Sequence, residues 1–161
     1  QKKYIVVSPD AGAAKRTLAL AKHMQLNTMI MHKQRDYSKP GSIKKTIIIS
    51  ECDRYNSDCT AIICDDIADT CGTLISAINE LILFGIKDII CIITHGIFSN
   101  NAIDKINKCK YITKFIVSDS IPQDENCKKC NKLEVFSIAD LMANVIRKIQ
   151  LGESISDLFI F

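Results

Sequence analysis

Short apolar runs of strand length alternate along this chain with longer segments in which apolar residues recur at helical spacing. This alternation predicts βαβ units joined by right-handed crossovers, and therefore a mainly parallel sheet flanked by helices. The predicted fold class is α/β with three layers. Strands are predicted at Tyr4–Val7, Thr28–Met31, Thr46–Ile49, Ala61–Cys64, Asp88–Ile93, Phe115–Val117 and Leu133–Phe136, and helices at about Ala11–Met24, Gly72–Phe84, Ser99–Asn107 and Ile138–Ile149.

Polar segments separate several of these elements and are predicted to be loops. Lys33–Lys45 contains Pro40-Gly41, a pair typical of turns, and Cys127–Cys130 encloses two lysines. The tail Gly152–Phe161 carries apolar residues that we expect to dock against another surface. Asp88–Ile93 is the most apolar run and is expected near the centre of the sheet. Parallel sheets bind ligands beyond the carboxyl ends of their strands, so the polar residues that follow strands are the candidate site residues.

Composition excludes several classes of partner. The net charge is only +3, and the basic residues are dispersed rather than clustered with aromatic side chains, which argues against nucleic acid and against a membrane surface. No apolar stretch reaches the roughly 18 residues of a membrane span. The chain of 161 residues fits one domain. Its first residues, Gln1-Lys2-Lys3, run straight into an apolar segment without a signal peptide, which predicts a cytoplasmic domain of a larger protein.

The eight cysteines do not resemble a disulfide framework. Cys64 and Cys91 lie inside apolar runs, where cysteine acts as a small hydrophobic residue. Cys127 and Cys130 have CxxC spacing, but a structural zinc site would need a second pair of ligands, and the histidines lie far upstream. We therefore expect eight reduced thiols and no bound zinc, as in a reducing compartment.

The segment Asp65–Thr73, which reads DDIADTCGT, is the strongest candidate for a ligand site. A buried strand delivers Asp65 and Asp66 at its carboxyl end, and a short turn leads into a helix. Backbone N–H groups at a helix N-terminus bind phosphate, and the hydroxyls of Thr70 and Thr73 add donors. The two carboxylates can accept hydrogen bonds from ribose hydroxyls or hold Mg²⁺. A sequence of this kind is typical of a sugar-phosphate site.

The same residue types also occur without a ligand. Acidic residues after a strand, followed by a threonine that caps a helix, are found in many α/β proteins. From the residues alone, a ligand site and a structural helix cap stay equally open.

Several motifs in this chain, in the same order, resemble those of ribose-phosphate pyrophosphokinases. The Asp65–Thr73 segment is similar to their ribose-phosphate loop, and VSPDAGAAKR at 7–16 resembles their SPDAGGAKR stretch. HKQR at 32–35 resembles HKER, while THGIFS at 94–99, IPQ at 121–123 and GESISDLF at 152–159 match later segments. The resemblance covers nearly the whole chain and implies a phosphoribosyltransferase-like fold of type I. Ala13 replaces the second glycine of the first motif.

The resemblance implies roles for individual residues. Asp10 matches a ligand of the Mg²⁺ at the reacting centre, and Lys33 and Arg35 match cations of a catalytic flexible loop. Without the resemblance, Asp10 would be a helix cap and the two cations part of a solvated loop. The residues that match the ribose 5-phosphate site are Asp65, Asp66, Asp69, Thr70, Cys71, Gly72 and Thr73. Those that match an allosteric site for ADP or phosphate in regulated members are Ser154, Ile155 and Phe159, which could also be a docked tail.

The implied activity is transfer of the diphosphoryl group of ATP to ribose 5-phosphate, giving phosphoribosyl pyrophosphate and AMP. The resemblance is to the C-terminal half of these enzymes, so 1–161 is expected to be one domain of a larger two-domain enzyme and to be inactive alone. Its expected partners are its own N-terminal domain and neighbouring subunits of a homo-oligomer.

Two other functions stay open. A non-catalytic subunit associated with pyrophosphokinases would keep the fold but would lose the intact loop, which is present here. A phosphoribosyltransferase would share the loop, but the THGIFS and GESISDLF stretches point away from it.

Overall fold

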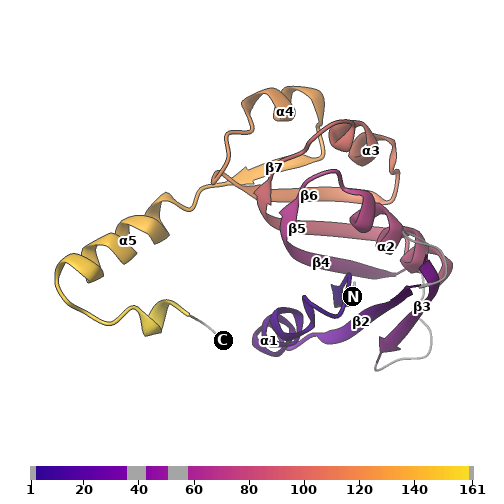
Figure 1. Cartoon of the computed structure of the whole chain (residues 1–161), viewed down its shortest axis with the longest axis horizontal. Helices are drawn as coiled ribbons and strands as arrows, with labels where there is room; N and C mark the ends of the chain where they lie inside the picture. The colour runs from indigo at the N-terminus through magenta and orange to yellow at the C-terminus, as the bar shows by residue number, and fades with distance from the viewer. Residues whose placement is uncertain (1–2, 36–42, 51–57, 160–161) are drawn as a thin grey trace.

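The computed structural model describes residues 3–35, 43–50 and 58–159 of the chain. Within these residues, seven strands alternate with five α-helices and a final 3₁₀ turn (Figure 1). The strands are β1 (Lys3–Ser8), β2 (Asn27–Arg35), β3 (Ile43–Ser50), β4 (Cys59–Ala68), β5 (Asp88–Gly96), β6 (Ile112–Ser118) and β7 (Leu133–Phe136). The helices are α1 (Ala14–Met24), α2 (Gly72–Leu83), α3 (Ala102–Lys108), α4 (Asp124–Lys129) and α5 (Ala139–Gln150), followed by η1 (Ser156–Leu158).

The seven strands form one sheet in the order β3-β2-β1-β4-β5-β6-β7. All neighbouring strands run parallel except β2 and β3, which pair antiparallel at one edge. The predicted mainly parallel α/β sheet is confirmed, and all seven predicted strands are present. The most apolar predicted strand, β5, lies inside the sheet between β4 and β6.

Helices lie on both faces of this sheet. The chain moves from β1 to β2 in one direction and from β4 through β5 to β6 in the other. Right-handed crossovers therefore place α1 on one face and both α2 and α3 on the other. The larger core lies between the sheet and α2 and α3, and it contains Ile63, Cys91 and Phe115.

The sequence of α2 explains how this helix covers the sheet. Its buried residues are Leu74, Ala77, Ile78 and Leu81, which recur at the spacing of one helical face. The helix ends before Gly85, whose φ of 98° is a left-handed conformation that glycine adopts readily. The interaction between this face and the sheet fixes the start of α2 beside the end of β4.

The predicted loop Lys33–Lys45 is partly wrong. Residues up to Arg35 extend β2, and β3 begins at Ile43, so polar residues form an antiparallel edge hairpin. A hairpin can contain polar side chains because its cross-strand hydrogen bonds come from the backbone. Residues 36–42, the remainder of the predicted loop, lie outside the described residues, as does the polar segment 51–57.

The predicted loop around the CxxC pair is also wrong. Residues Asp124–Lys129 form α4, which includes Cys127. Acidic residues in its first turn and lysines in its last turn complement the helix dipole. Cys127 is exposed whereas Cys130 is buried, so the two thiols are in different surroundings.

Within the described residues, the C-terminal segment does not pack on this domain, so the surface on which its apolar residues were expected to dock is not part of the described chain. Figure 1 shows α5 and the residues after it extending away from the sheet. No residue of α5 is buried, and the exposed fraction of Phe159 is 61%. The start of α5 is held by Asp119, whose Oδ1 accepts a hydrogen bond from the Ile138 amide at 2.9 Å.

No helix in the described part of the chain has the length and apolar character needed to cross a bilayer.

Candidate functional site

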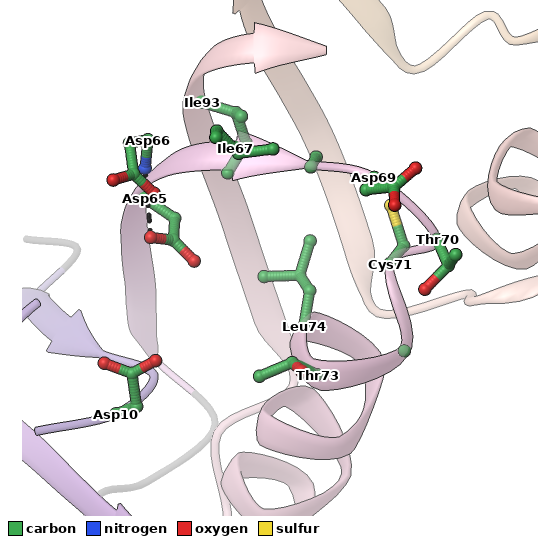
Figure 2. A pocket seen from close by; sticks show the side chains of 12 residues that line it. Asp10, Asp65, Asp66, Ile67, Asp69, Thr70, Cys71, Thr73, Leu74 and Ile93 are labelled. Carbon is green, nitrogen blue, oxygen red and sulfur yellow. Dashed lines mark hydrogen bonds between the residues drawn. The ribbon is translucent and has the colours of Figure 1, made fainter. Parts of the chain in front are cut away.

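A hollow of about 260 Å³ opens where β4 leaves the core and α2 begins. The end of β1 contributes Asp10, the end of β4 contributes two carboxylates, and the β4–α2 loop closes the other side. Figure 2 shows these side chains from close by. The lining residues are Asp10, Asp65, Asp66, Ile67, Ala68, Asp69, Thr70, Cys71, Gly72, Thr73, Leu74 and Ile93. The structure thus brings Asp10 together with the whole predicted Asp65–Thr73 segment.

The carboxylates of Asp10 and Asp65 point toward one another across this hollow (Figure 2). Asp10 Oδ1 accepts a hydrogen bond from the Ala13 amide at 3.0 Å, and its backbone carbonyl accepts one from Ser8 Oγ at 2.6 Å. Asp10 therefore braces the turn before α1 without capping the helix, because Ala13 is the N-cap residue and no side chain caps α1. The same residue also lines the hollow, so bracing and ligand binding are compatible.

Arg16 holds the two neighbouring carboxylates of β4. Its Nη1 donates to Asp66 Oδ2 at 2.9 Å, and its Nη2 lies 3.6 Å from Asp65 Oδ1. Sequence reasoning did not assign Arg16 a role. Arg16 and Asp66 are 50 residues apart in the sequence. The order of the sheet, which puts β1 and the following α1 beside β4, brings them together.

The two neighbouring carboxylates differ in their electrostatics. Burial raises the pKa of Asp65 to about 6, and the negative charges of Asp66 and Asp10 add to this effect. The hydrogen bond from Arg16 lowers the pKa of Asp66 instead. The protein thus compensates the negative charge of Asp65 less than that of Asp66. A bound cation would compensate that charge.

The carboxylates fit a magnesium ion that the substrate helps to hold. Mg²⁺ binds oxygen ligands and is usually held through one or two carboxylates together with phosphate oxygens. Asp10 and Asp65 supply two facing carboxylates. Among the described residues, no group of three or more His, Cys, Asp or Glu side chains is arranged around a metal position. A ligand set made by the protein alone is therefore not present in that part of the chain.

The loop between β4 and α2 is held from outside the hollow. Lys105 Nζ on α3 donates to the Thr70 carbonyl at 2.7 Å, and the Ala68 carbonyl accepts from the amides of Ile97 and Phe98, each at 3.0 Å. These bonds direct the loop carbonyls away from the hollow. Sequence reasoning did not identify Lys105, which is 35 residues away from its partner.

Cys71 makes the turn into α2 with a left-handed backbone, φ 56° and ψ 13°. Its side chain is buried and makes no capping hydrogen bond to the helix. A Cβ added at Gly72 would meet only Thr70 Oγ1, at an ordinary contact distance of 3.7 Å. The protein itself therefore does not require glycine at 72, and the missing side chain leaves the first turn of α2 open toward the hollow.

The predicted catalytic cations lie on β2. Ser8 at the end of β1 pairs with Ile30, so Lys33 and Arg35 continue past the carboxyl end of β1 in the direction of Asp10. Their backbone belongs to a strand rather than to the loop that the sequence predicted.

The predicted allosteric residues lie elsewhere, in the segment that follows α5. Ser154 Oγ bonds to Ser156 Oγ at 3.0 Å, and Ile155 immediately precedes η1. None of Ser154, Ile155 and Phe159 lines the hollow.

The cysteines agree with the predicted free thiols as far as the structure describes them. Seven are free, and Cys52 lies outside the described residues. Burial raises the pKa of Cys64 and of Cys71 to about 11, so neither is a reactive thiolate at neutral pH.

The model of the phosphoribosyl synthetase-associated domain family matches residues 55–160, which include the β4–α2 loop. The chain belongs to this family. The family is that of the C-terminal region of ribose-phosphate pyrophosphokinases. A curated relative, ribose-phosphate pyrophosphokinase 3 of Saccharomyces cerevisiae, is 39% identical over 155 residues, covering 96% of this chain and 46% of its own length.

One solved structure of a relative has the same fold as this chain. The crystal structure of phosphoribosylpyrophosphate synthetase from Mycobacterium smegmatis matches with a TM-score of 0.78 and 30% identity, over 94% of this chain and 46% of that one. The chain thus spans about half the length of these relatives. A purine phosphoribosyltransferase from Pyrococcus horikoshii matches with a TM-score of only 0.39 and 18% identity, over 59% of this chain and 70% of that one.

Proposed function

We propose that this chain provides the ribose 5-phosphate half of a ribose-phosphate pyrophosphokinase active site. The proposed reaction transfers the diphosphoryl group of ATP to the 1-hydroxyl of ribose 5-phosphate, giving phosphoribosyl pyrophosphate and AMP. One observation carries the proposal: in a chain of this family, two carboxylates and the first turn of α2 line the same hollow. Carboxylates suit sugar hydroxyls and a helix N-terminus suits a phosphate, so both parts of the substrate have a counterpart.

The 5-phosphate would bind to the loop Asp69–Thr73. The first N–H groups of an α-helix lack partners within the helix, and α2 has neither a capping side chain at Cys71 nor an acidic residue in its first turn. Thr73 lines the hollow in the first turn of α2, so its hydroxyl would reach a phosphate oxygen bound there. Asp69 reduces the electrostatic attraction, so directed hydrogen bonds would contribute more than net charge.

The ribose would lie toward the carboxylates. Asp65 and Asp66 would accept hydrogen bonds from the ribose hydroxyls, while Asp10 and Asp65 would hold Mg²⁺. When bound, Mg²⁺ supplies the positive charge that stabilises the negative charge developing on the phosphoryl oxygens. Arg16 keeps Asp66 charged and oriented, while Asp65, whose contact with Arg16 is longer at 3.6 Å, would share its charge with the cation.

Lys33 and Arg35 would act at the transferring phosphoryl group. Charge grows on phosphoryl oxygens during the transfer, and cations placed near them lower the barrier. The extension of β2 past the end of β1 supports this role, because it carries both residues beyond the edge of the sheet at which Asp10 lies.

The rest of the enzyme would come from outside this chain. The relatives are about twice as long, which supports 1–161 as the C-terminal domain of a larger two-domain protein that is inactive by itself. An N-terminal domain and neighbouring subunits of a homo-oligomer would complete the ATP site, in the cytoplasm.

Ser154, Ile155 and Phe159 would contribute to an allosteric site for ADP or phosphate at a subunit boundary.

Calorimetric titration of the chain with ribose 5-phosphate, in the presence of Mg²⁺, tests this proposal. Thr73→Ala should weaken binding by about 1–2 kcal/mol, or roughly five- to thirtyfold, the scale of one hydrogen bond to a charged group. Ser76→Ala is the matched control, since Ser76 lies one turn further along α2 and outside the lining of the hollow.

Three results would contradict the proposal. In the first, Thr73→Ala binds ribose 5-phosphate as tightly as the unchanged chain, which would make the loop a structural helix cap. In the second, phosphoribosyl pyrophosphate binds much more tightly than ribose 5-phosphate, which would favour a phosphoribosyltransferase. No binding of either ligand would favour a non-catalytic associated subunit.

A further inference from the structure

A second hollow, of about 360 Å³, opens beside α2 and α3, and it shares no lining residue with the first one. Its volume falls within the roughly 300–1,000 Å³ of small-molecule sites in proteins. The lining comes from α2, α3 and the short connection from α3 to β6. The lining residues are Ile75, Asn79, Lys105, Lys108, Cys109, Lys110 and Tyr111.

The floor of this hollow is apolar. Ile75, Cys109 and Tyr111 are partly buried and pack against the main core. Lys110 Nζ lies 5.1 Å from the centroid of the Tyr111 ring, within range of a cation–π interaction. The floor thus offers an aliphatic side chain and a flat ring, both held in place from beneath.

The rim of the hollow is cationic. Lys105 and Lys108 are three residues apart on α3 and share one face, and Lys110 is the second residue after the helix. No Asp or Glu is among the lining residues, so the three positive charges are not neutralised from within the hollow. An apolar floor under several ammonium groups suits a ligand that is both flat and anionic.

A structural explanation for these lysines would be that they cap the C-terminal end of α3. Lys132 already has that role, since its Nζ donates to the carbonyls of Ile106, Asn107 and Cys109 at 3.2, 3.0 and 2.8 Å. Lys105 points to a different partner, the Thr70 carbonyl, at 2.7 Å. The lysines of the rim are therefore not needed to satisfy the end of α3.

We propose that this second hollow binds a phosphorylated small molecule with a flat ring system. The Lys110 ammonium, which lies over the Tyr111 ring, would swing off it, so that the ligand's ring lies on Tyr111 and Ile75 and its phosphate contacts the ammonium groups of Lys108 and Lys110. Lys105 would remain bonded to Thr70, which places the second site directly behind the β4–α2 loop. This ligand is distinct from ribose 5-phosphate, which has no flat apolar ring to cover the floor.

Titration of the ¹⁵N-labelled chain with 1-naphthyl phosphate, followed by amide chemical shifts, tests the site. The amides of Ile75, Cys109 and Tyr111 should shift, with saturation. The double variant K108Q/K110Q should weaken binding by about tenfold, because it removes two charges at a partly exposed site. Lys87→Gln is the matched control, because Lys87 is an exposed lysine in the connection after α2 and does not line the hollow. The affinity of this variant for 1-naphthyl phosphate should equal that of the unchanged chain.

Controls on the ligand separate this site from the first hollow. Inorganic phosphate and 1-naphthol should each bind the second hollow much more weakly than 1-naphthyl phosphate, as judged from the shifts of these amides. Inorganic phosphate lacks the flat ring, and 1-naphthol lacks the phosphate. Equal binding of inorganic phosphate would overturn the proposal, as would unchanged affinity in K108Q/K110Q or shifts confined to residues 69–73. Ribose 5-phosphate plays no part in this titration, so its outcome does not depend on the function proposed for the first hollow.

Discussion

The two halves of β4 have the same backbone pairing with β5 but very different surroundings. Residues Cys59–Ile63 are all buried, whereas Asp65, Asp66 and Ile67 emerge from the core. The register of the sheet explains this difference, because β1 pairs with β4 only as far as Ile63, while β5 continues alongside to Ala68. The second half thus has a neighbour on one side only. One strand therefore stabilises the fold with its first half and presents carboxylates with its second.

The largest expected effect is in the buried half. Ile63→Ala should lower the free energy of unfolding by about 3 kcal/mol or more, since Ile63 is fully buried and its truncation leaves a cavity. Ile67→Ala, on the same strand but with its side chain 49% exposed, should cost less than about 1 kcal/mol. Urea denaturation of both variants measures the difference. Equal losses would show that the two halves do not differ as described.

A smaller change in the free energy of unfolding, of opposite sign, is expected in the second half of β4. Asp65→Asn should stabilise the folded chain at pH 8, on the order of 1 kcal/mol after allowance for its partial exposure. The pKa of Asp65 is raised from 3.8 to about 6 on folding, so its ionisation lowers stability as the pH rises through that window. At pH 4 the carboxyl is largely protonated in the folded state, and the gain should be nearly absent. Denaturation curves at the two pH values check this.

Asp66→Asn is the matched control, because the pKa of Asp66 is lowered by its bond to Arg16. A lowered pKa contributes stability above its ordinary range, which is lost as the pH falls through the folded pKa. Asp66→Asn should therefore leave the chain slightly less stable at pH 8. A gain in stability for both variants at pH 8 would contradict the different electrostatics of the two carboxylates.

Local patterns in the sequence predicted the strands and the segment that lines the first hollow. Strands and helices differ in the period of their apolar residues, and parallel strands bring their carboxyl ends to one edge, so Asp10 and Asp65 could be expected to meet. The role of Arg16 could not be predicted, because nothing in the spacing of two residues 50 positions apart tells which carboxylate an arginine reaches.

The packing of α5 could not be predicted from the sequence, for a different reason. Its helical period predicts which face is apolar but not what covers that face, and the helix projects from the domain with Ile146 and Ile149 exposed. The extension of β2 through Lys33 and Arg35 was missed because polar side chains resemble a loop. Backbone pairing with β3 makes that segment a strand regardless of its side chains.

The most direct test of the central claim is where ribose 5-phosphate contacts the chain. Amide chemical shifts of the ¹⁵N-labelled chain should change most at Thr70, Gly72 and Thr73 during a titration with ribose 5-phosphate. With Mg²⁺ present, the amides of Asp65 and Asp66 should respond as well, because the sugar and the cation would lie at that end of the hollow. Saturable shifts centred on these residues are the predicted result. Binding that leaves the amides of 69–73 unchanged would contradict the account.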